Sequence, residues 1–582
     1  MSAVPEARLS PARGSRWILP AEIIAPAVLA RELGIAIAAA KVLAHRGLTD
    51  PAEARRFLNP SLDDLLDPFA LRDMAPAVER IRRAIADKEK ILIYGDYDVD
   101  GTTSVVLLSK AIELAGGSAD YHVPHRLRDG YGMRPEVVET MAADGVKLIV
   151  SVDTGIRAAE VVKRARELGI DMIITDHHLP ESELPPALAV LNPNRPDCTY
   201  PEKNLCGAGV AFKLVQALLG TLGWPDAKVR RVSESFLKLV AIATVADVVP
   251  LTGENRVIVR HGLNGLHEVR NPGLRAILDV AGFTGDSTPG AHQVAFQIAP
   301  RINAAGRMDT ANAVVEMFLT NDPARARELA KLLHDQNGER QQVELQIRET
   351  CERIAVDESA AALVYYDETW HRGVLGIVAS KLVDRLRRPV FVLGRNEDDG
   401  MVQGSGRSIP AFHLLEALES MPELFLRFGG HKHAAGVTMN AEHVEEFRRR
   451  FNEYALSVLK PEDFLRNIEI EAVVELRDIT ENAVVDIFGL APFGHSNQPP
   501  WFAAMNVEVA APPVIMKEKH LRVNVKQNGR AMKLKAWNMA ERAAELVPGT
   551  HIDVAFQLEE DPSSAARGYA PWSATLRDFR IV

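Results

Sequence analysis

The sequence is poor in cysteine and has no long apolar run. Only three cysteines occur in 582 residues, and no two of them form a CxxC pair. Such a set cannot build a disulfide framework or a cysteine-based zinc site, and it indicates a reducing compartment. No apolar run approaches the roughly 18–20 residues of a membrane-spanning helix, and the first residues lack the pattern of a secretory leader. We therefore expect a cytoplasmic protein without a membrane segment.

The chain also has no excess of positive charge. Its formal net charge is −10 at pH 7, which taken alone disfavours a nucleic-acid partner because phosphate binding depends on Lys and Arg. A local basic surface is still compatible with an acidic total. With 47% hydrophobic and 25% charged residues, the composition is that of a globular protein. The length predicts roughly three to five domains.

Two α/β patterns and one β pattern follow one another along the chain. Short apolar runs alternate with helix-period segments from residue 91 to 193, which predicts an α/β domain with a parallel, doubly wound sheet. A second α/β pattern follows, and then short alternating runs predict a small β-barrel. The predicted domains are an N-terminal helical extension (1–70), the first α/β domain (71–320), a long solvated connector helix (321–358), the second α/β domain (359–460) and the barrel (461–582).

Three aspartates at alternating positions follow the first predicted strand. Asp96, Asp98 and Asp100 in YGDYDVDGTTS lie where a strand ends and a helix begins. Open parallel sheets bind ligands beyond the carboxyl ends of their strands, and three crowded carboxylates repel one another unless cations bind them. Oxygen-rich sites suit Mg²⁺, Mn²⁺ or Ca²⁺. The motif therefore predicts a metal site.

Other interpretations of this motif fit the sequence less well. An EF-hand loop matches D-x-D-x-D-G but requires Glu at its twelfth position, where the chain has Leu107. Phosphatases of the haloacid dehalogenase type carry a similar DxDGT loop, but their nucleophilic Asp leaves the strand directly, whereas three residues intervene here. A solvated acidic turn does not explain three aspartates at period two after a strand.

Further acidic and imidazole residues follow later apolar runs. Asp153 follows LIVSV, and Asp247 follows LVAIATVA. The triplet Asp176, His177 and His178 follows MIIT. One such residue is most often a cap or turn residue, but the whole set suits two divalent ions about 4 Å apart, which hold a phosphodiester and ionise a water. The imidazoles shift the preference toward Mn²⁺.

These motifs resemble those of a known superfamily. GDYDVDG, VDTG, TDHH and ADVVP are similar to the four motifs of the DHH phosphoesterases. The segments VPHRLRDGYGM, IAPRINAAGRM, GSGRS and FGGHKHAAG further resemble the RecJ family of single-stranded-DNA exonucleases. The order and spacing of the motifs agree over residues 75–500.

The resemblance implies a role for each acidic and imidazole residue. Two divalent cations, Mn²⁺ or Mg²⁺, would share Asp153, with Asp98 completing one site. Asp100, His177 and Asp247 would complete the other site. Around these ligands, Asp96 would orient a water or complete a shell, while Asp176 and His178 would orient ligands or contact phosphate.

The resemblance also implies substrate contacts outside the metal site. The glycines of FGGHKHAAG, in the DHH-associated domain, allow the backbone to approach a ligand closely, and Arg407 is a rigid fork for phosphate. Each of these residues taken alone also fits a structural salt bridge, cap or surface turn. The expected contacts are Arg126, Arg301, Asn303, Ser405, Arg407, Ser408, Gly430, His431 and His433.

A basic stretch near the C-terminus answers the objection from net charge. Residues 517–535 contain seven Lys and Arg and one Glu, around a QNGR turn. Alternation predicts a hairpin with one apolar and one basic face. Such a ribbon is typical of single-strand binding and fits strands 2 and 3 of an OB-fold, which the resemblance implies here, although an ordinary solvated hairpin is the alternative. The predicted contacts are Arg522, Lys526, Lys533, Lys535 and Trp537.

Together these features predict a metal-dependent exonuclease that acts on single-stranded DNA. By resemblance it degrades DNA 5′ to 3′ to mononucleotides in recombination and repair, as a monomer, with a single-strand-binding protein and a helicase as partners. A cleft between the α/β domains would admit one strand and exclude a duplex. Two other functions are a DHH phosphodiesterase of short oligonucleotides or cyclic dinucleotides, whose relatives lack the barrel, and an inactive DNA-binding scaffold, whose relatives lose metal ligands that this chain keeps.

Overall fold

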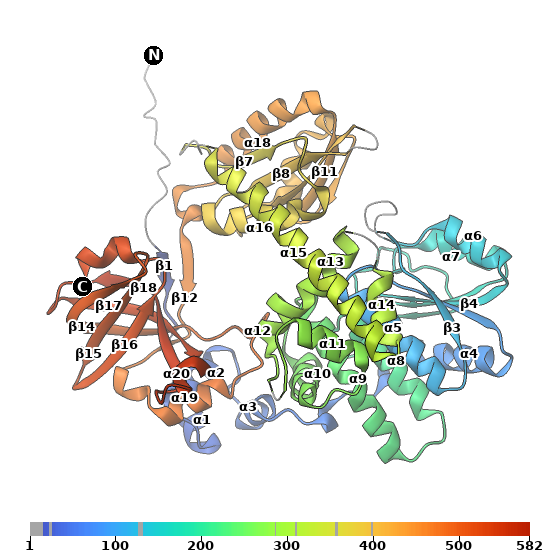
Figure 1. Cartoon of the computed structure of the whole chain (residues 1–582), viewed down its shortest axis with the longest axis horizontal. Helices are drawn as coiled ribbons and strands as arrows, with labels where there is room; N and C mark the ends of the chain where they lie inside the picture. Colours follow the sequence, from blue (N-terminus) through green and yellow to red (C-terminus); the bar gives the residue numbers. More distant parts are fainter. Residues whose placement is uncertain are drawn as a thin grey trace. The chain divides into compact units, whose positions relative to one another are not determined.

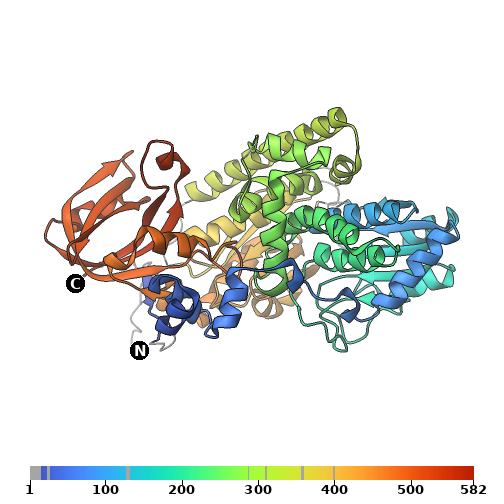
Figure 2. The same ribbon diagram turned by 90° about the horizontal axis from the view of Figure 1, so that it is seen from below.

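The computed structural model divides the chain into two compact units (Figures 1 and 2). One unit contains Met1–Ile18 and Gln336–Glu469, and the other contains Leu19–Asp335 and Ile470–Val582. Among the described residues, no helix combines the length and the apolarity that crossing a membrane requires. The structure describes residues 15–21, 26–125, 132–285, 287–308, 311–354, 359–396 and 400–582.

The predicted doubly wound sheet is confirmed. Five parallel strands lie in the order β3 (Ala119–His122), β2 (Lys90–Tyr94), β4 (Val146–Val152), β5 (Asp171–Thr175) and β6 (Ala189–Leu191). The central strands β2, β4 and β5 bury residues on both faces because helices cover both sides of the sheet. One face packs on α4 (Met74–Ala86), α5 (Val99–Leu114) and α8 (Gly207–Gly220), and the other on α6 (Pro135–Ala143) and α7 (Ala159–Glu167).

The strand order places the acidic motifs together. From β2 the chain passes to β3 on one side and then to β4 on the other side of β2. In doubly wound sheets this reversal opens a crevice beyond the carboxyl ends of the two strands. Asp96, Asp98 and Asp100 follow β2, and Asp153 follows β4.

Helices complete this part of the unit. The apolar run before Asp247 is the helix α9 (Asp226–Ala246), so this aspartate follows a helix and not a strand. The 31-residue connector α15 (Pro323–Arg353) is confirmed, but it is not wholly solvated, because it buries Leu329, Leu333, Ile347 and Cys351 at helical spacing. The other helices are α10 (Gly253–Asn264), α11 (Pro272–Val280), α12 (Ala291–Gln293), α13 (Ala299–Met308) and α14 (Asn312–Leu319).

The other unit contains a five-stranded mixed sheet. Its order is β10 (Arg427–Gly430), β11 (Ala434–Met439), β9 (Val402–Arg407), β8 (Val390–Arg395) and β7 (Leu363–Tyr366). Only β7 and β8 are parallel, joined through α16 (Leu375–Leu386). The GSGRS segment lies on a strand, β9, rather than in a loop. Also in this unit are α17 (Leu414–Glu419), α18 (Val444–Val458) and the pair β1 (Ser15–Ile18) and β12 (Arg466–Glu469).

The predicted C-terminal barrel is confirmed. The strands β14 (Phe502–Met516), β15 (His520–Gln527), β16 (Arg530–Ala536), β18 (Trp572–Ile581) and β17 (His551–Glu560) follow one another, and β17 pairs with β14 to close the barrel. The order 1-2-3-5-4 and a parallel contact between the third and fifth strands define an OB-type barrel. β13 (Ala472–Val473), α19 (Glu481–Phe488) and α20 (Pro562–Ala565) complete it.

The N-terminal helices share the core of the barrel. α1 (Pro26–Leu33), α2 (Ile37–His45) and α3 (Pro51–Leu58) bury Leu29, Leu43 and other side chains against Val484 and Phe502. Arg46 also forms a two-pronged ion pair with Glu471, with N–O distances of 2.6 and 3.0 Å. The helical part of the predicted extension therefore packs with the C-terminal domain.

Candidate metal centre

The loop after β2 and the first turn of α5 carry Asp96 and two of the predicted metal ligands, Asp98 and Asp100. Asp98 caps α5, and its Oδ1 accepts a hydrogen bond of 3.0 Å from the Gly101 N–H. A Cβ at residue 101 would lie 2.6 Å from the carbonyl oxygen of Asp96, so only glycine permits this tight turn. Asp96 and Asp100 are both buried. The loop thus directs three carboxylates into one small volume.

Asp100 is held by the first turn of another helix. Its two carboxylate oxygens accept backbone hydrogen bonds of 2.5 Å from Gly207 and 2.8 Å from Ala208, at the start of α8. The partial positive charge of a helix N-terminus favours the ionised carboxylate. Sequence reasoning did not identify these two donors.

Asp153 has an unusual backbone conformation. It lies directly after β4 with φ of 59°, in the left-handed region that non-glycine residues rarely adopt. Its N–H donates to the Thr175 carbonyl at 2.9 Å, which continues the pairing with β5. Such strain persists where surrounding structure imposes it, often at functional sites. The result is a buried carboxylate aimed at the neighbouring loops.

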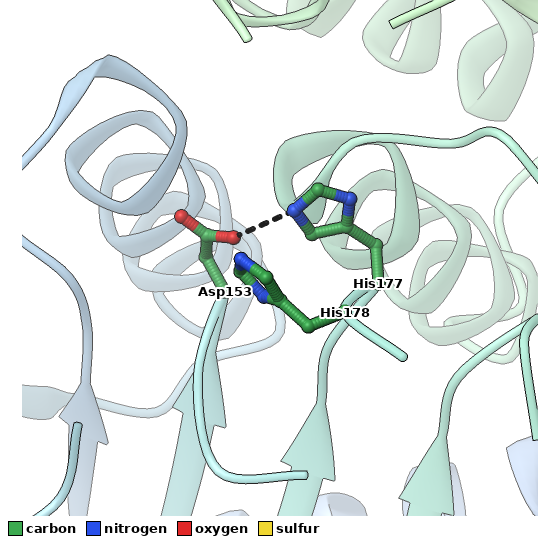
Figure 3. Close-up of side chains that lie close together, drawn as sticks. All are labelled: Asp153, His177 and His178. Carbon is green, nitrogen blue, oxygen red and sulfur yellow. Dashed lines mark ion pairs between the residues drawn. The ribbon is translucent and has the colours of Figure 1, made fainter. Parts of the chain in front are cut away.

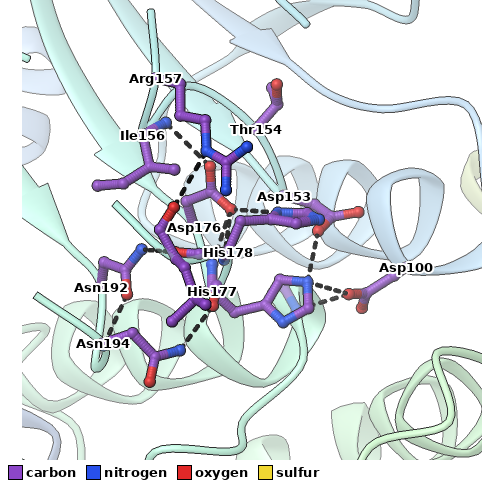
Figure 4. Close-up of polar contacts among 12 residues, drawn as sticks. Asp100, Asp153, Thr154, Ile156, Arg157, Asp176, His177, His178, Asn192 and Asn194 are labelled. Atoms are coloured by element: carbon purple, nitrogen blue, oxygen red, sulfur yellow. Dashed lines mark hydrogen bonds and ion pairs between the residues drawn. The ribbon is translucent and has the colours of Figure 1, made fainter. Parts of the chain in front are cut away.

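His177 lies among three of the predicted carboxylates; Figure 3 shows it beside Asp153, and Figure 4 shows it with Asp153 and Asp100. Its Nε2 is 3.2 Å from Asp153 Oδ1, 3.8 Å from Asp100 Oδ2 and 3.8 Å from Asp247 Oδ2. The Asn194 side chain donates to the His177 carbonyl at 2.7 Å and fixes the backbone of this residue. The imidazole therefore connects residues that follow β2, β4, β5 and α9.

Asp176 and His178 form a pair beside this cluster (Figure 4). Asp176 Oδ1 accepts hydrogen bonds from the His177 N–H at 2.8 Å and from His178 Nδ1 at 2.7 Å, and Oδ2 accepts one from the Ile156 N–H at 2.9 Å. Asn192 Nδ2 donates to the His178 carbonyl at 2.8 Å. Asp176 is thus occupied in orienting its neighbours. Asn192 and Asn194 had not been identified from the sequence.

The donor atoms form groups that fit divalent cations. Asp96, Asp98 and Asp153 offer ligand atoms within 4.8 Å of one another, and so do Asp100, His177 and Asp247. The buried Asp153 Oδ1 and Asp247 Oδ2 accept no hydrogen bond from any residue that the structure describes. Leaving buried charged oxygens without a partner is costly, and a cation removes that cost. Oxygen donors with one imidazole suit Mn²⁺ or Mg²⁺.

The pKa values show how strongly the site needs cations. Burial, followed by the charges of Asp100, Asp98 and Asp96, raises the pKa of Asp153 well above its ordinary value. Burial and the charge of Asp100 likewise raise the pKa of Asp98, and the same causes raise the pKa of Asp247 to about 9. Burial lowers the pKa of His177, which favours the neutral imidazole that binds metals.

Asn303 and Arg301 lie on α13, next to the acidic loop. Asn303 Oδ1 accepts a hydrogen bond of 3.1 Å from the Val99 N–H at the start of α5, so this side chain holds the loop that carries Asp98 and Asp100. Arg301 Nε donates to His334 at 3.1 Å. The predicted contact Arg126 lies outside the described residues.

The predicted contacts of the other unit gather at one end of its sheet. Arg407 donates to Ser405 Oγ at 2.8 Å on β9, and Ser408 N–H donates to the His433 carbonyl at 3.1 Å. A Cβ at Gly376 would lie 2.9 Å from the Arg407 guanidinium, so α16 packs closely on it. Gly430, with φ of 147°, leads into the turn that exposes His431 and His433.

The basic hairpin has the predicted faces. Arg522 pairs with Lys535, and Asn524 with Lys533, across β15 and β16, while Leu521, Val523, Val525, Met532, Leu534 and Ala536 face the barrel core. Two of the lysines are in ion pairs, Lys526 with Glu508 at 2.8 Å and Lys535 with Asp561 at 2.6 Å. Trp537 is 46% exposed, and its ring centroid is 4.8 Å from that of His520.

Comparison with known proteins decides the family. The chain matches the DHH family, N-terminal domain (residues 90–244), the DHHA1 domain (359–457) and the RecJ OB domain (470–563). It is 41% identical to the single-stranded-DNA-specific exonuclease RecJ of Dickeya dadantii, over 71% of this chain and 73% of the relative. The chain belongs to the RecJ family. The fold and recognition predicted from the motifs are therefore confirmed.

Other RecJ proteins show how much of the family's length is present. The Bacillus subtilis protein is 38% identical over 91% of this chain, and the match spans 66% of that relative. The chain thus covers just under two thirds of this relative, but 82% of the Escherichia coli protein, to which it is 36% identical over 79% of its own length.

Solved RecJ structures agree with the fold and with the metal centre. The chain superimposes on RecJ from Thermus thermophilus in complex with Mn²⁺ with a TM-score of 0.82 at 30% identity, covering 97% of this chain and 80% of that chain. The Mg²⁺ complex of the same protein gives a TM-score of 0.75 at 29% identity, covering 97% and 78%. The donor set of this chain accordingly fits the two cations that were expected, Mn²⁺ or Mg²⁺.

Gly207→Ala should disrupt the metal centre without changing a ligand. A Cβ at residue 207 would lie 2.6 Å from Asp153 Oδ1, so Asp153 or the start of α8 must move. We expect Mn²⁺ affinity, measured by calorimetry, to fall by about tenfold or more, as for other residues that orient metal ligands. Gly220→Ala, at the other end of α8 where a Cβ meets nothing within 4 Å, is the control and should bind Mn²⁺ normally. Equal affinity in both variants would contradict the close-contact argument.

The stability of the metal-free protein should fall as the pH rises. The folded state holds the protons of Asp153 and Asp247 more tightly than the unfolded chain does, so the stability that they contribute is complete at acidic pH and is lost as the pH approaches about 9. Mn²⁺ should stabilise the protein more at higher pH, because the ligands must be deprotonated. Thermal unfolding with and without Mn²⁺ measures both effects.

Asp247→Asn tests the source of this pH dependence. The variant should flatten the metal-free curve and raise the melting temperature at pH 8, because the neutral Asn spares the folded state the cost of taking up a proton at this position, which burial and the charges of Asp100 and Asp98 impose on Asp247. It should also lose part of the stabilisation by Mn²⁺. Asp144→Asn, which removes an exposed carboxylate at the opposite end of β4 from Asp153, should leave both curves unchanged. A pH profile that is the same in the two variants would refute the assignment.

Proposed function

We propose that the chain is a metal-dependent exonuclease that degrades single-stranded DNA in the 5′-to-3′ direction to mononucleotides, in recombination and repair. The observation that carries this proposal is the pair of ligand groups, Asp96–Asp98–Asp153 and Asp100–His177–Asp247, at the crevice of the doubly wound sheet. The three relatives described above are named single-stranded-DNA-specific exonuclease RecJ. The barrel argues against a phosphodiesterase of short oligonucleotides, and the full ligand set argues against an inactive scaffold.

The residues of the centre divide the work of hydrolysis. Two bound divalent cations supply an ionised water and stabilise charge on the attacked phosphate. The α8 N–H groups hold Asp100 in one orientation, and the left-handed backbone at Asp153 directs its carboxylate between the two ligand groups. Neutral His177 offers Nε2 as a ligand. The protein thus fixes every donor before the substrate arrives.

His178 is suited to donate a proton to the substrate. Although burial lowers its pKa, the hydrogen bond from Nδ1 to Asp176 and the Asp176 charge raise the pKa above the ordinary value. In its protonated form this imidazole, next to the ligand groups, would donate a hydrogen bond to a phosphate oxygen or protonate the leaving group. Asp176 itself acts as a positioning residue.

Two further surfaces would bind the strand. The end of the mixed sheet presents Arg407, Ser405 and the turn with His431 and His433, which are donors for phosphate. The outer face of the barrel hairpin presents basic residues next to the exposed Trp537, as in single-strand binding by charge and stacking. We further propose that the protein is cytoplasmic and monomeric. Its proposed partners are a single-strand-binding protein and a helicase.

Asp153→Ala should abolish hydrolysis and keep DNA binding. The substitution removes the carboxylate nearest to both ligand groups but none of the strand-binding donors. We expect the loss of nuclease activity with Mn²⁺ or Mg²⁺, while the affinity for an oligonucleotide in EDTA remains within about twofold of the wild type. The assay uses 5′- or 3′-labelled single strands and a blunt duplex. Retained hydrolysis in the variant, shortening from the 3′ end, or equal rates on the duplex would each refute the corresponding part of the proposal.

The hairpin should contribute to the salt dependence of binding. Arg522 and Lys533 make no ion pair with any carboxylate in the part of the chain that the structure describes, whereas Lys526 and Lys535 are paired. The double variant Arg522→Ala, Lys533→Ala should weaken oligonucleotide binding and reduce the slope of log affinity against log salt by about 1.4, at roughly 0.7 per phosphate contact. Lys526→Ala, Lys535→Ala is the matched control and should change the slope less. An unchanged slope in the first variant would exclude the hairpin from binding.

A further inference from the structure

The segment that enters the barrel contacts the loop that follows Asp247. We call residues 490–498 the strap. The Leu251 N–H donates to the His495 carbonyl of the strap at 2.9 Å. The Leu251 side chain is buried, and a Cβ at Gly494 would lie 2.5 Å from its Cδ1. The strap therefore packs on a residue four positions after a metal ligand, with no space between them.

The strap has one fixed shape. Asn497 is 1% exposed, and its side-chain amide donates to the carbonyls of Leu490 at 3.0 Å and Pro492 at 2.7 Å. Gly494 and Asn497 exchange backbone hydrogen bonds of 2.9 and 3.1 Å. Arg46 donates to Asn497 and also pairs with Glu471. The strap is thus anchored to the barrel and to the helices that share its core.

A buried arginine joins the strap to α10. Arg256 is 2% exposed, its Nε donates to the Phe57 carbonyl at 2.6 Å, and its Nη2 donates to the Ala491 carbonyl at 2.8 Å. The guanidinium carbon lies 3.6 Å from the centre of the Phe57 ring. No described carboxylate pairs with Arg256. A buried cation held only by carbonyls and a ring links three segments that are far apart in the sequence.

The first turn of α10 also contacts the segment that precedes α8. Asn255 Nδ2 donates to the carbonyls of Pro250 at 3.1 Å and Asn204 at 2.6 Å, and Tyr200 donates to Glu254 at 2.6 Å. The strap and residues 200–206 therefore both contact the loop between α9 and α10 or the first turn of α10. The loop also contains Val248 with φ of 60°, a conformation that a β-branched residue keeps only when its surroundings impose it.

We propose that the strap is a positioning element for the metal ligand Asp247, so that the entry to the barrel sets the affinity of the cation site formed by Asp100, His177 and Asp247. This inference rests on the proposed function because it takes Asp247 to be a metal ligand. The strap contacts the loop and not the ligands, and it lies outside the hairpin. Loosening the strap should therefore weaken cation binding and leave DNA binding intact.

Two variants of the full chain loosen the strap in different ways. Gly494→Val forces a side chain into Leu251, and Arg256→Met removes the link to Ala491 while keeping the volume. We expect the Mn²⁺ affinity from calorimetry to fall by about tenfold and the Mn²⁺ concentration for half-maximal nuclease activity to rise by the same factor. Activity at saturating Mn²⁺ and oligonucleotide affinity in EDTA should stay within about twofold of the wild type.

A control variant separates positioning from loss of stability. Val554→Ala, in the barrel core on β17, lowers stability by creating a cavity but leaves the strap intact, so its Mn²⁺ affinity should equal that of the wild type. Wild-type Mn²⁺ affinity in both strap variants would overturn the proposal, and so would a loss in Val554→Ala that matches theirs at the same melting temperature. If the wild type binds Mn²⁺ but hydrolyses no DNA, the proposed function fails, while the calorimetry still decides the role of the strap.

Discussion

The metal centre depends on mutual repulsion among buried carboxylates that the fold prevents from separating. Asp96, Asp98, Asp100, Asp153 and Asp247 converge where several elements end, and burial together with neighbouring charge raises the pKa of three of them. Solvent cannot relieve this repulsion, because the groups are largely shielded from it. Divalent cations relieve this repulsion. Cation binding should therefore stabilise the folded protein, and the two are thermodynamically linked.

Backbone geometry keeps these groups in place. Glycine at 101 and 207 permits approaches that a Cβ would block, the α8 N–H groups bind Asp100, and the backbone at Asp153 is left-handed. Each feature restricts one ligand to one direction. We infer that the strap also helps to hold a ligand in place, because it contacts the loop that follows Asp247. Backbone carbonyls and the buried Arg256 connect the strap to this loop and to α10.

The organisation of the chain separates chemistry from strand binding. The doubly wound sheet carries the candidate metal ligands, the mixed sheet carries the proposed phosphate contacts, and the barrel carries a basic hairpin face with an exposed tryptophan. The N-terminal helices contribute to the core of the barrel rather than forming a module of their own. The acidic net charge and the basic hairpin are compatible because net charge is a sum over the whole chain, while residues 517–535 hold seven Lys and Arg and one Glu.

The sequence by itself determined the strand and helix order, the barrel and the set of candidate ligands, because apolar periodicity and motif spacing are local properties. Asp98, Asp100, Asp153, His177 and Asp247 all belong to this set, and their assignment to two cation sites came from the resemblance to the DHH phosphoesterases. The tertiary structure alone decided which groups orient them: Gly207 and Ala208 on Asp100, Asn194 on His177, and Asn303 on the acidic loop. It also decided that the first helices pack with the barrel and that the strap reaches Leu251. These contacts join residues up to several hundred positions apart, and they form only when the packing of whole elements brings distant backbone groups within hydrogen-bonding distance, which no local pattern encodes.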